Sequence, residues 1–259
     1  MRYREHPPPQ ALRPFVRCLW ELAHDYGGSG YSREHLWATP YAELLVLRAG
    51  SYRAGGRTLQ GVAFMGPRTR PVTLTSDERV ELVAARFHVG GARDLLACRP
   101  GDAVDLVADA PEVLAPTTPL GSATTLTALA GWLHLHLGHA TPDPVVVTAA
   151  RIVAERCGQV PVTSLAGELG TTTRTLQRRF DRSAGMSPGA LARILRFNRA
   201  RELLVRDSRV DLAALAAETG YADHAHLTRT FRERFDLSPR EFRELLREIT
   251  EAGVASVQA

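Results

Sequence analysis

The chain has 259 residues, 44% of them hydrophobic, and a formal net charge of +4 at pH 7. This length suffices for one large domain or two ordinary ones with a real hydrophobic core. The apolar runs are too short to cross a bilayer and no signal-peptide pattern follows Met1, which argues against a membrane-spanning or secreted protein; we expect a cytoplasmic one.

Residues 1–30 are rich in proline and glycine, and within them Pro7-Pro8-Pro9 followed by residues 11–16 predicts an extended arm leading into a short element. Beyond this arm, short runs of apolar and β-branched residues are separated by glycine and proline. Short runs at such spacing predict a small β-barrel or sandwich. The predicted strands cover residues 43–48, 62–65, 72–75 and 80–88.

After these strands, residues 90–98 have a helical pattern, and 99–121 are predicted to be loop with short pieces of structure. A longer apolar helix is predicted at 123–137. Its leucines serve two structures equally well, packing onto the barrel or forming a homodimer interface, and both alternatives stay open. They are Leu126, Leu129, Leu133 and Leu137.

The segment Thr141-Pro142-Asp143-Pro144 breaks the pattern, and helical periodicity dominates beyond it. We therefore predict an α+β protein. A β-rich regulatory domain at residues 1–142 precedes an all-helical domain at 143–250 and a flexible tail at 251–259.

The helical part contains an internal repeat of 50–51 residues. In each copy, a helix with a Leu-Ala-x-Glu segment ends at a glycine, and a second helix carries Leu and Phe four residues apart. A Ser-Pro pair follows each second helix. The corresponding segments are 165–170 with 215–220, 176–180 with 227–231, and 185–188 with 236–239.

Each copy has the parts of a helix-turn-helix. Gly170 or Gly220 ends the first helix, where a positive φ is needed. Thr172 or Asp223 is placed to cap the second helix. Gly185 in the first copy, and Asp236 in the second, come at the end of that helix. We therefore expect two helix-turn-helix units joined by a long helix.

The second helix of each unit has an apolar face and a basic one. Leu176 and Phe180 share one face in the first unit, as Leu227 and Phe231 do in the second. At 100° per residue, the side chains predicted to point away are Arg174, Gln177, Arg178, Asp181 and Arg182, then Ala225, His226, Thr228, Arg229 and Arg232.

Arginine and glutamine on such a face match the donor and acceptor pattern of base edges in the major groove. The charge distribution agrees, since residues 151–250 hold 18 arginines and 13 acidic residues, whereas the rest of the chain holds 14 and 15. All 32 basic residues are arginine, whose planar guanidinium suits phosphates and guanine. We therefore predict double-stranded DNA as the partner.

Between the units, residues 188–205 are predicted to form one long helix. A helix of roughly 17 residues spans roughly 25 Å. This length could hold the two exposed helices near one DNA turn apart, about 34 Å. We expect both to enter major grooves on one face of the duplex.

The region 145–245 resembles the AraC/XylS transcription regulators. The stretch 220–235 followed by Ser238-Pro239 is similar to the family signature almost position by position, and so is Arg196 with Ala200 and Leu203-Leu204 in the connecting helix. The resemblance implies a DNA-binding transcription regulator that is not an enzyme, with RNA polymerase as a further partner if it activates.

The resemblance also implies which residues contact DNA. In the first unit they are Arg174, Gln177 and Arg178, and in the second His224, Ala225, His226, Thr228 and Arg229. We expect Arg182 and Arg232 to reach phosphates. The segments 66–72 and 85–91 loosely resemble sensor domains of the same family, which implies that residues 1–142 bind a small-molecule effector or dimerise.

The alternative is an enzyme fused to a DNA-binding module, or a barrel whose main work is small-molecule binding. No catalytic motif supports it, and neither a cofactor nor a metal is expected. His134 and His136 lie about 200° apart on a helix and cannot share a metal. The three cysteines, Cys18, Cys98 and Cys157, form neither a disulfide framework nor a metal pattern.

Overall fold

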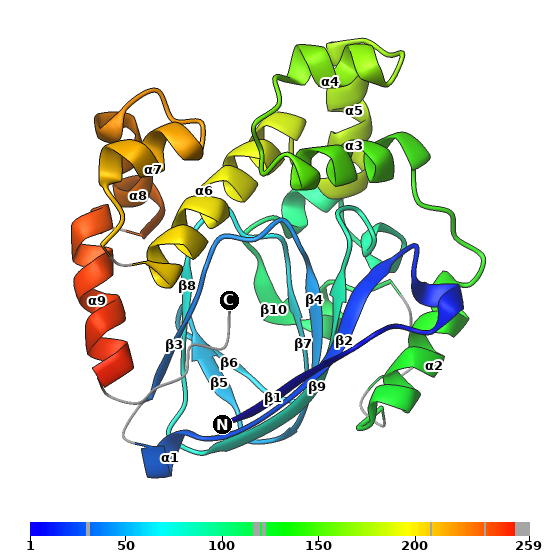
Figure 1. Ribbon diagram of the computed structural model, residues 1–259. Helices are drawn as coiled ribbons and strands as arrows, with labels where there is room; N and C mark the ends of the chain where they lie inside the picture. Colours follow the sequence, from blue (N-terminus) through cyan, green and yellow to red (C-terminus); the bar gives the residue numbers. More distant parts are fainter. Residues whose placement is uncertain (30–31, 116–119, 121–122, 208, 236, 252–259) are drawn as a thin grey trace.

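The computed structural model describes residues 1–29, 32–115, 120, 123–207, 209–235 and 237–251. A β-rich N-terminal part precedes a wholly helical C-terminal part, which confirms the predicted α+β class (Figure 1). The division into domains at residues 142 and 143 stays a prediction. The last helix ends at Glu251, and the rest of the predicted tail, like Asp236, lies outside the described residues.

In the part of the chain that the structure describes, ten strands form two antiparallel sheets. The first sheet has the order β1 (Arg2–His6), β2 (Val16–Asp25), β9 (Arg79–Phe87), β4 (Glu43–Ala49), β7 (Val62–Met65) and β10 (Val107–Asp109). The second has the order β3 (Arg33–Leu36), β8 (Val72–Thr75), β5 (Tyr52–Ala54) and β6 (Arg57–Leu59). The four predicted strands correspond to β4, β7, β8 and β9, with ends within one residue of the prediction.

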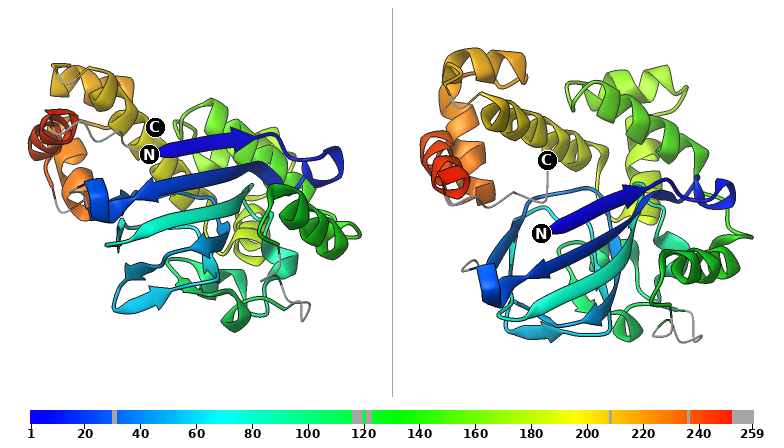
Figure 2. Two further views of the ribbon diagram at one scale, coloured as in Figure 1. Left: turned by 90° about the horizontal axis from the view of Figure 1, so that it is seen from below. Right: turned by 60° about the horizontal axis from the view of Figure 1, so that its bottom comes forward.

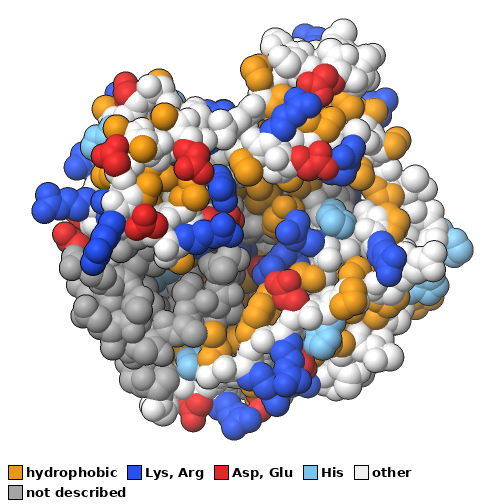
Figure 3. All heavy atoms as spheres, in the orientation of Figure 1, with side chains coloured by type: hydrophobic (Ala, Val, Ile, Leu, Met, Phe, Trp, Pro, Cys, Tyr) orange, Lys and Arg blue, Asp and Glu red, His pale blue; other side chains and the backbone are white. Residues whose placement is uncertain are grey.

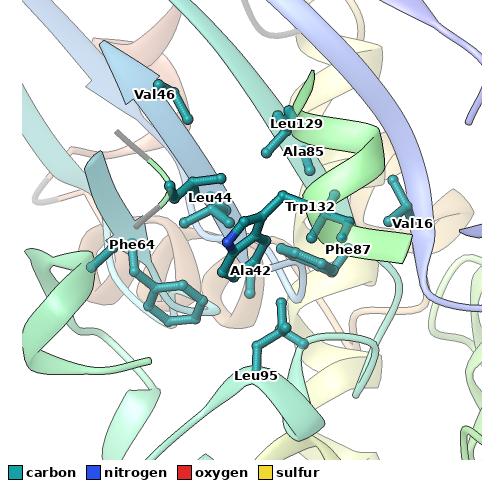
Figure 4. Close-up of a cluster of buried hydrophobic side chains, with 14 of the residues drawn as sticks. Val16, Ala42, Leu44, Val46, Phe64, Ala85, Phe87, Leu95, Leu129 and Trp132 are labelled. Carbon is teal, nitrogen blue, oxygen red and sulfur yellow. The ribbon is translucent and has the colours of Figure 1, made fainter. Parts of the chain in front are cut away.

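The six-stranded sheet is the middle layer, and both of its faces are covered. Leu44 and Val46 face helix α2 (Leu126–Leu137), whereas Leu45 and Leu47 face the four-stranded sheet. Because side chains alternate along a strand, burial of both faces requires the continuous apolar run seen in β4. Figure 4 shows the cluster on the helix side, where Trp132 lies among residues of the sheet.

Helix α2 uses its leucines to pack onto the barrel. Leu129 and Leu133 are fully buried in the same cluster as Phe87 and Leu44. Of the two alternatives that the sequence left open, the structure shows packing onto the barrel. The buried leucines are therefore not available for a homodimer interface. Near the end of this helix, the His136 ring stacks on the Trp132 ring, with ring centroids 4.2 Å apart.

The proline segment 7–9 has no regular structure and leads into a short 3-10 turn, Gln10–Leu12. Strands β1 and β2, which were not predicted from the sequence, lie on either side of it, and β2 lies between β1 and β9 (Figure 2). The prolines interrupt only the connection between the two strands, and β2 is apolar on both faces, so it has no alternating pattern to detect. The predicted helix at 90–98 is wrong, because only a short 3-10 turn forms at Arg93–Leu95, after Gly90 with its φ of 78°.

The helical part lies across one end of the barrel. Its first unit contains α3 (Pro144–Glu155), α4 (Val162–Glu168) and α5 (Thr173–Ala184). Its second contains α7 (Leu212–Glu218), α8 (His224–Phe235) and α9 (Pro239–Glu251). Figure 1 shows α6 (Pro188–Arg206) connecting the two units, as the sequence predicted. Among the described residues, no helix has the length and apolar character needed to cross a membrane.

Candidate nucleic-acid interface

Helix α5 is fixed by caps at both ends. The Thr172 Oγ1 accepts a hydrogen bond of 3.2 Å from the Thr175 amide, as predicted for an N-cap residue. At the other end, Gly185 has a φ of 67°, which allows the left-handed cap. Leu176 and Phe180 are fully buried. The caps and the two buried side chains therefore fix the helix, and the face opposite Leu176 and Phe180 points outward.

The outward face of α5 carries three arginines and one acidic residue, Asp181. Arg174, Gln177, Arg178 and Arg182 are all exposed. Within the part of the chain that is described, none of the three arginines forms an ion pair with a carboxylate. The inward-leaning Arg179 differs, since it contacts Asp143 at 2.9 Å. The exposed face is therefore free to bind an anionic partner.

Helix α8 is built in the same way. The Asp223 Oδ1 accepts a hydrogen bond of 2.6 Å from the His226 amide, and Leu227 and Phe231 are fully buried. His224, Arg229 and Arg232 are exposed.

Two further side chains on α8 lie partly against the protein. His226 is half-buried, with its ring edge-on to Tyr221 at 5.2 Å. Thr228 is also half-buried, and its Oγ1 lies 3.4 Å from His224 Nε2. The structure therefore places His224, Arg229 and Arg232 farther outward than these two residues.

The turns before α5 and α8 both use a glycine with positive φ. The φ of Gly170 is 59° and that of Gly220 is 71°. Any side chain would strain these positions, which explains why both repeats keep glycine there. The two units thus share the geometry of a helix, a tight turn and a capped second helix.

Comparison with known proteins agrees with this geometry. Residues 165–245 match the model of a helix-turn-helix domain, and residues 4–109 match that of a domain of unknown function, DUF6597. The C-terminal part of the chain is an AraC-type helix-turn-helix domain.

The relatives of this helix-turn-helix domain include the HTH-type transcriptional activator RhaS. The chain is 35% identical over 81 residues to RhaS of Citrobacter koseri, and 32% identical over 81 residues to RhaS of Escherichia coli K12. In both cases the match covers 31% of this chain and 29% of the relative. The chain therefore spans less than a third of the length of these relatives.

Solved structures with some similarity include those of AraT and ToxT. The C-terminal domain of AraT from Geobacillus stearothermophilus is 22% identical, with a TM-score of 0.38, covering 40% of this chain and 86% of that one. ToxT from Vibrio cholerae is 11% identical, with a TM-score of 0.47, covering 87% of this chain and 98% of that one.

The two units of the helix-turn-helix domain are linked by Arg196 of α6. Its Nη2 donates to the Gly158 carbonyl at 3.0 Å, and its Nη1 donates to the Gly220 carbonyl at 3.2 Å. One guanidinium therefore joins the α3–α4 connection of the first unit to the turn of the second. The sequence contains no signal for this link, because its partners are more than 60 residues apart.

The β-rich part contacts both units. At the first, a Cβ on Gly185 would collide with the Pro100 carbonyl, so the two backbones approach closely. At the second, Trp37 lies edge-on to Phe242 with ring centroids 5.7 Å apart. Between them, Asn198 of α6 donates to the Ala38 carbonyl at 3.1 Å. The β-rich part therefore packs directly against both units and against α6.

Proposed function

We propose that this protein is a sequence-specific, DNA-binding transcription regulator. The observation that carries the proposal is the pair of capped helices, α5 and α8, whose outward faces display arginines without ion-pair partners in the described chain. Such helices are suited to the major groove, where arginine and glutamine distinguish base pairs. The similarity to relatives named transcriptional activators supports the same function. No catalytic role is assigned.

The proposed contacts divide into base-reading and phosphate-binding residues. Bases are read from α5 by Arg174, Gln177 and Arg178, and from α8 by His224, His226, Thr228 and Arg229. Arg182 and Arg232, farther along each helix, bind phosphates. Because His226 and Thr228 are half-buried, we expect smaller contributions from them than from the exposed Arg229.

The length of α6 supports simultaneous binding by both units. Its 19 residues correspond to roughly 28 Å at about 1.5 Å per residue. This approaches the 34–36 Å between half-sites one turn apart that two recognition helices require. A single chain would then cover two adjacent half-sites on one side of the duplex.

The β-rich residues 1–142 are proposed to regulate this binding, as a domain separate from residues 143–250. Contact with both units and with α6 supports such a role. A small-molecule effector and a homodimer are the proposed means. The relatives' name favours activation, and RNA polymerase is then the further partner.

The experiment that tests this function selects bound sequences from random DNA duplexes with the full chain. We expect a motif of two half-sites, with binding that weakens steeply as salt rises because phosphate contacts release counterions. The matched control carries Arg151→Ala, since Arg151 lies on α3 and is paired with Glu155. Recovery of no common motif from the parent protein contradicts the proposal.

A further inference from the structure

A cavity of about 590 Å³ lies between the end of the barrel and α6. From the barrel side it is lined by Trp37, Tyr41 and Arg68, and from α6 by Leu195 and Asn198, among others. Figure 3 shows charged side chains gathered around this hollow, between the helical units and the barrel. Its volume is that of a small-molecule site.

A second, much smaller space lies between the two sheets of the barrel. It measures about 20 Å³ among the described residues, which is enough for about one water molecule. A row of ion pairs separates this space from the larger cavity. In it, Glu43 contacts Arg86 at 2.9 Å and Arg68 at 3.5 Å. Of these two spaces among the described residues, the one at the junction with α6 has room for a ligand.

The cavity wall has more positive than negative side chains. Five arginines and three glutamates line it, and Glu43 is shared between two of those arginines. A surplus of positive charge in a partly enclosed space favours an anion. The lining charges are Arg17, Arg68, Arg86, Arg199 and Arg201 against Glu5, Glu43 and Glu202.

Arg68 supplies the sharpest evidence. Its side chain is only 1% exposed, yet its Nη1 has no hydrogen-bond partner. Its other two contacts are long, from Nε to the Trp37 carbonyl at 3.4 Å and from Nη2 to Glu43 at 3.5 Å. A buried charged donor without a partner is costly, and an anionic oxygen would satisfy it.

The other residues that line the cavity indicate what the rest of the ligand should be like. Trp37, Tyr41 and Leu195 supply flat and apolar surface. The Asn198 Oδ1 is buried without a hydrogen-bond partner, so it can accept a bond from a hydroxyl or amide. Arg17, at 4.9 Å over the Tyr41 ring, is exposed and contributes a second guanidinium.

We propose that this cavity binds a small organic carboxylate with an apolar, flat body, and that Arg68 is its buried contact. Its regulatory consequence rests on the proposed function. A ligand that touches both Arg68 and α6 bridges the β-rich part and the helix that holds the two recognition helices, so its binding changes their arrangement. The site lies at this junction and not within the N-terminal domain alone.

Calorimetry with the full chain tests the site without DNA. Benzoate, 1-naphthoate and octanoate are each titrated, and each is compared with its neutral amide. At least one carboxylate is expected to bind at a ratio of one per chain, about tenfold or more tighter than its amide. Equal binding of acid and amide, or no heat from any of the three acids, overturns the proposal.

Variants locate the site. Arg68→Met is expected to weaken carboxylate binding by about tenfold or more, and Arg17→Gln by a smaller factor. If Arg68→Met does not fold, Arg17→Gln and Asn198→Leu supply the same test. Arg57→Gln, on the far surface beside Glu112, is the matched control and leaves binding unchanged. Undiminished binding in every cavity variant that folds overturns the assignment.

A further variant separates this proposal from the proposed function. Arg178→Gln removes a recognition-helix cation, so it weakens DNA binding but leaves carboxylate binding intact. Loss of carboxylate binding in Arg178→Gln means that the anion sits on the recognition helix, which overturns the cavity site. Carboxylate binding that leaves the DNA affinity of the parent chain unchanged supports the site and contradicts its regulatory consequence.

Discussion

The Gln159 Nε2 donates a hydrogen bond of 2.9 Å to the main-chain carbonyl of Glu218. Beside it, Arg196 of α6 donates one hydrogen bond to each unit, so the units are joined by one direct hydrogen bond and by one bridge through Arg196. The angle between the two recognition helices is therefore set by specific polar contacts as well as by α6.

Removing this link should uncouple the two units. Arg196→Met deletes both guanidinium bonds, so we expect preference for a two-half-site operator over a single half-site to fall by about tenfold. Affinity for a single half-site should stay within about twofold. Fluorescence anisotropy with both duplexes measures the ratio. An unchanged ratio would show that α6 alone sets the geometry.

Arg178 tests base reading by α5. Arg178→Ala should cost on the order of 1–3 kcal/mol of binding free energy and relax preference at one base position, because a bidentate contact is lost. Binding of the selected operator and of its single-base variants measures both effects. Parent-like affinity and selectivity would show that α5 does not read bases through this residue.

Gly185 tests the contact between α5 and the β-rich part. Gly185→Ala places a Cβ against the Pro100 carbonyl at a φ of 67°, so we expect a loss of roughly 2 kcal/mol or more in unfolding free energy. The matched control is Gly131→Ala in α2, where nothing lies within 4 Å. There alanine should stabilise by roughly 0.5–1 kcal/mol. Urea unfolding measures the change in unfolding free energy for both variants. We expect a decrease for Gly185→Ala and an increase for Gly131→Ala.

Glu34 tests the packing of the barrel interior. The Tyr26 hydroxyl donates to Glu34 at 2.8 Å, and Tyr52 lies 2.9 Å from that hydroxyl. Burial raises the pKa of Glu34 above its usual 4.5, and the nearby Glu43 raises it further, whereas the hydrogen bond from Tyr26 and the charge of Arg68 lower it. The protonated acid is therefore favoured by the fold.

The stability from this acid is complete below pH 4.5 and is lost as pH rises through the folded-state pKa. Glu34→Gln keeps the acceptor and removes the charge. We expect the variant to exceed the parent in stability at pH 7, with the difference shrinking toward pH 4.5. Thermal unfolding across this range measures it, with the exposed Glu112→Gln as control. A constant difference would exclude titration of Glu34 as the cause.

The repeat made the helical part predictable. Apolar residues at helical spacing, Gly170 and Thr172 in the first copy, and Gly220 and Asp223 in the second are local signals, so the elements and caps of both units follow from sequence. Strand β2 was missed because its apolar residues do not alternate, and its burial depends on neighbours far along the chain.

The outward face of α5 could be predicted from helical periodicity, but the junction cavity could not. Arg68 and Asn198 lie 130 positions apart, and only the docking of α6 on the barrel brings them to one cavity. Likewise, periodicity placed His226 outward, whereas its packing against Tyr221 depends on the turn before α8.

The central claim is that α5 and α8 of one chain bind adjacent grooves of one duplex. The most direct measurement is the affinity of the full chain for its selected operator before and after insertion of five base pairs between the half-sites. Half a turn moves one half-site to the opposite face. We predict that affinity falls to that of a single half-site. Equal affinity for both duplexes would contradict the account.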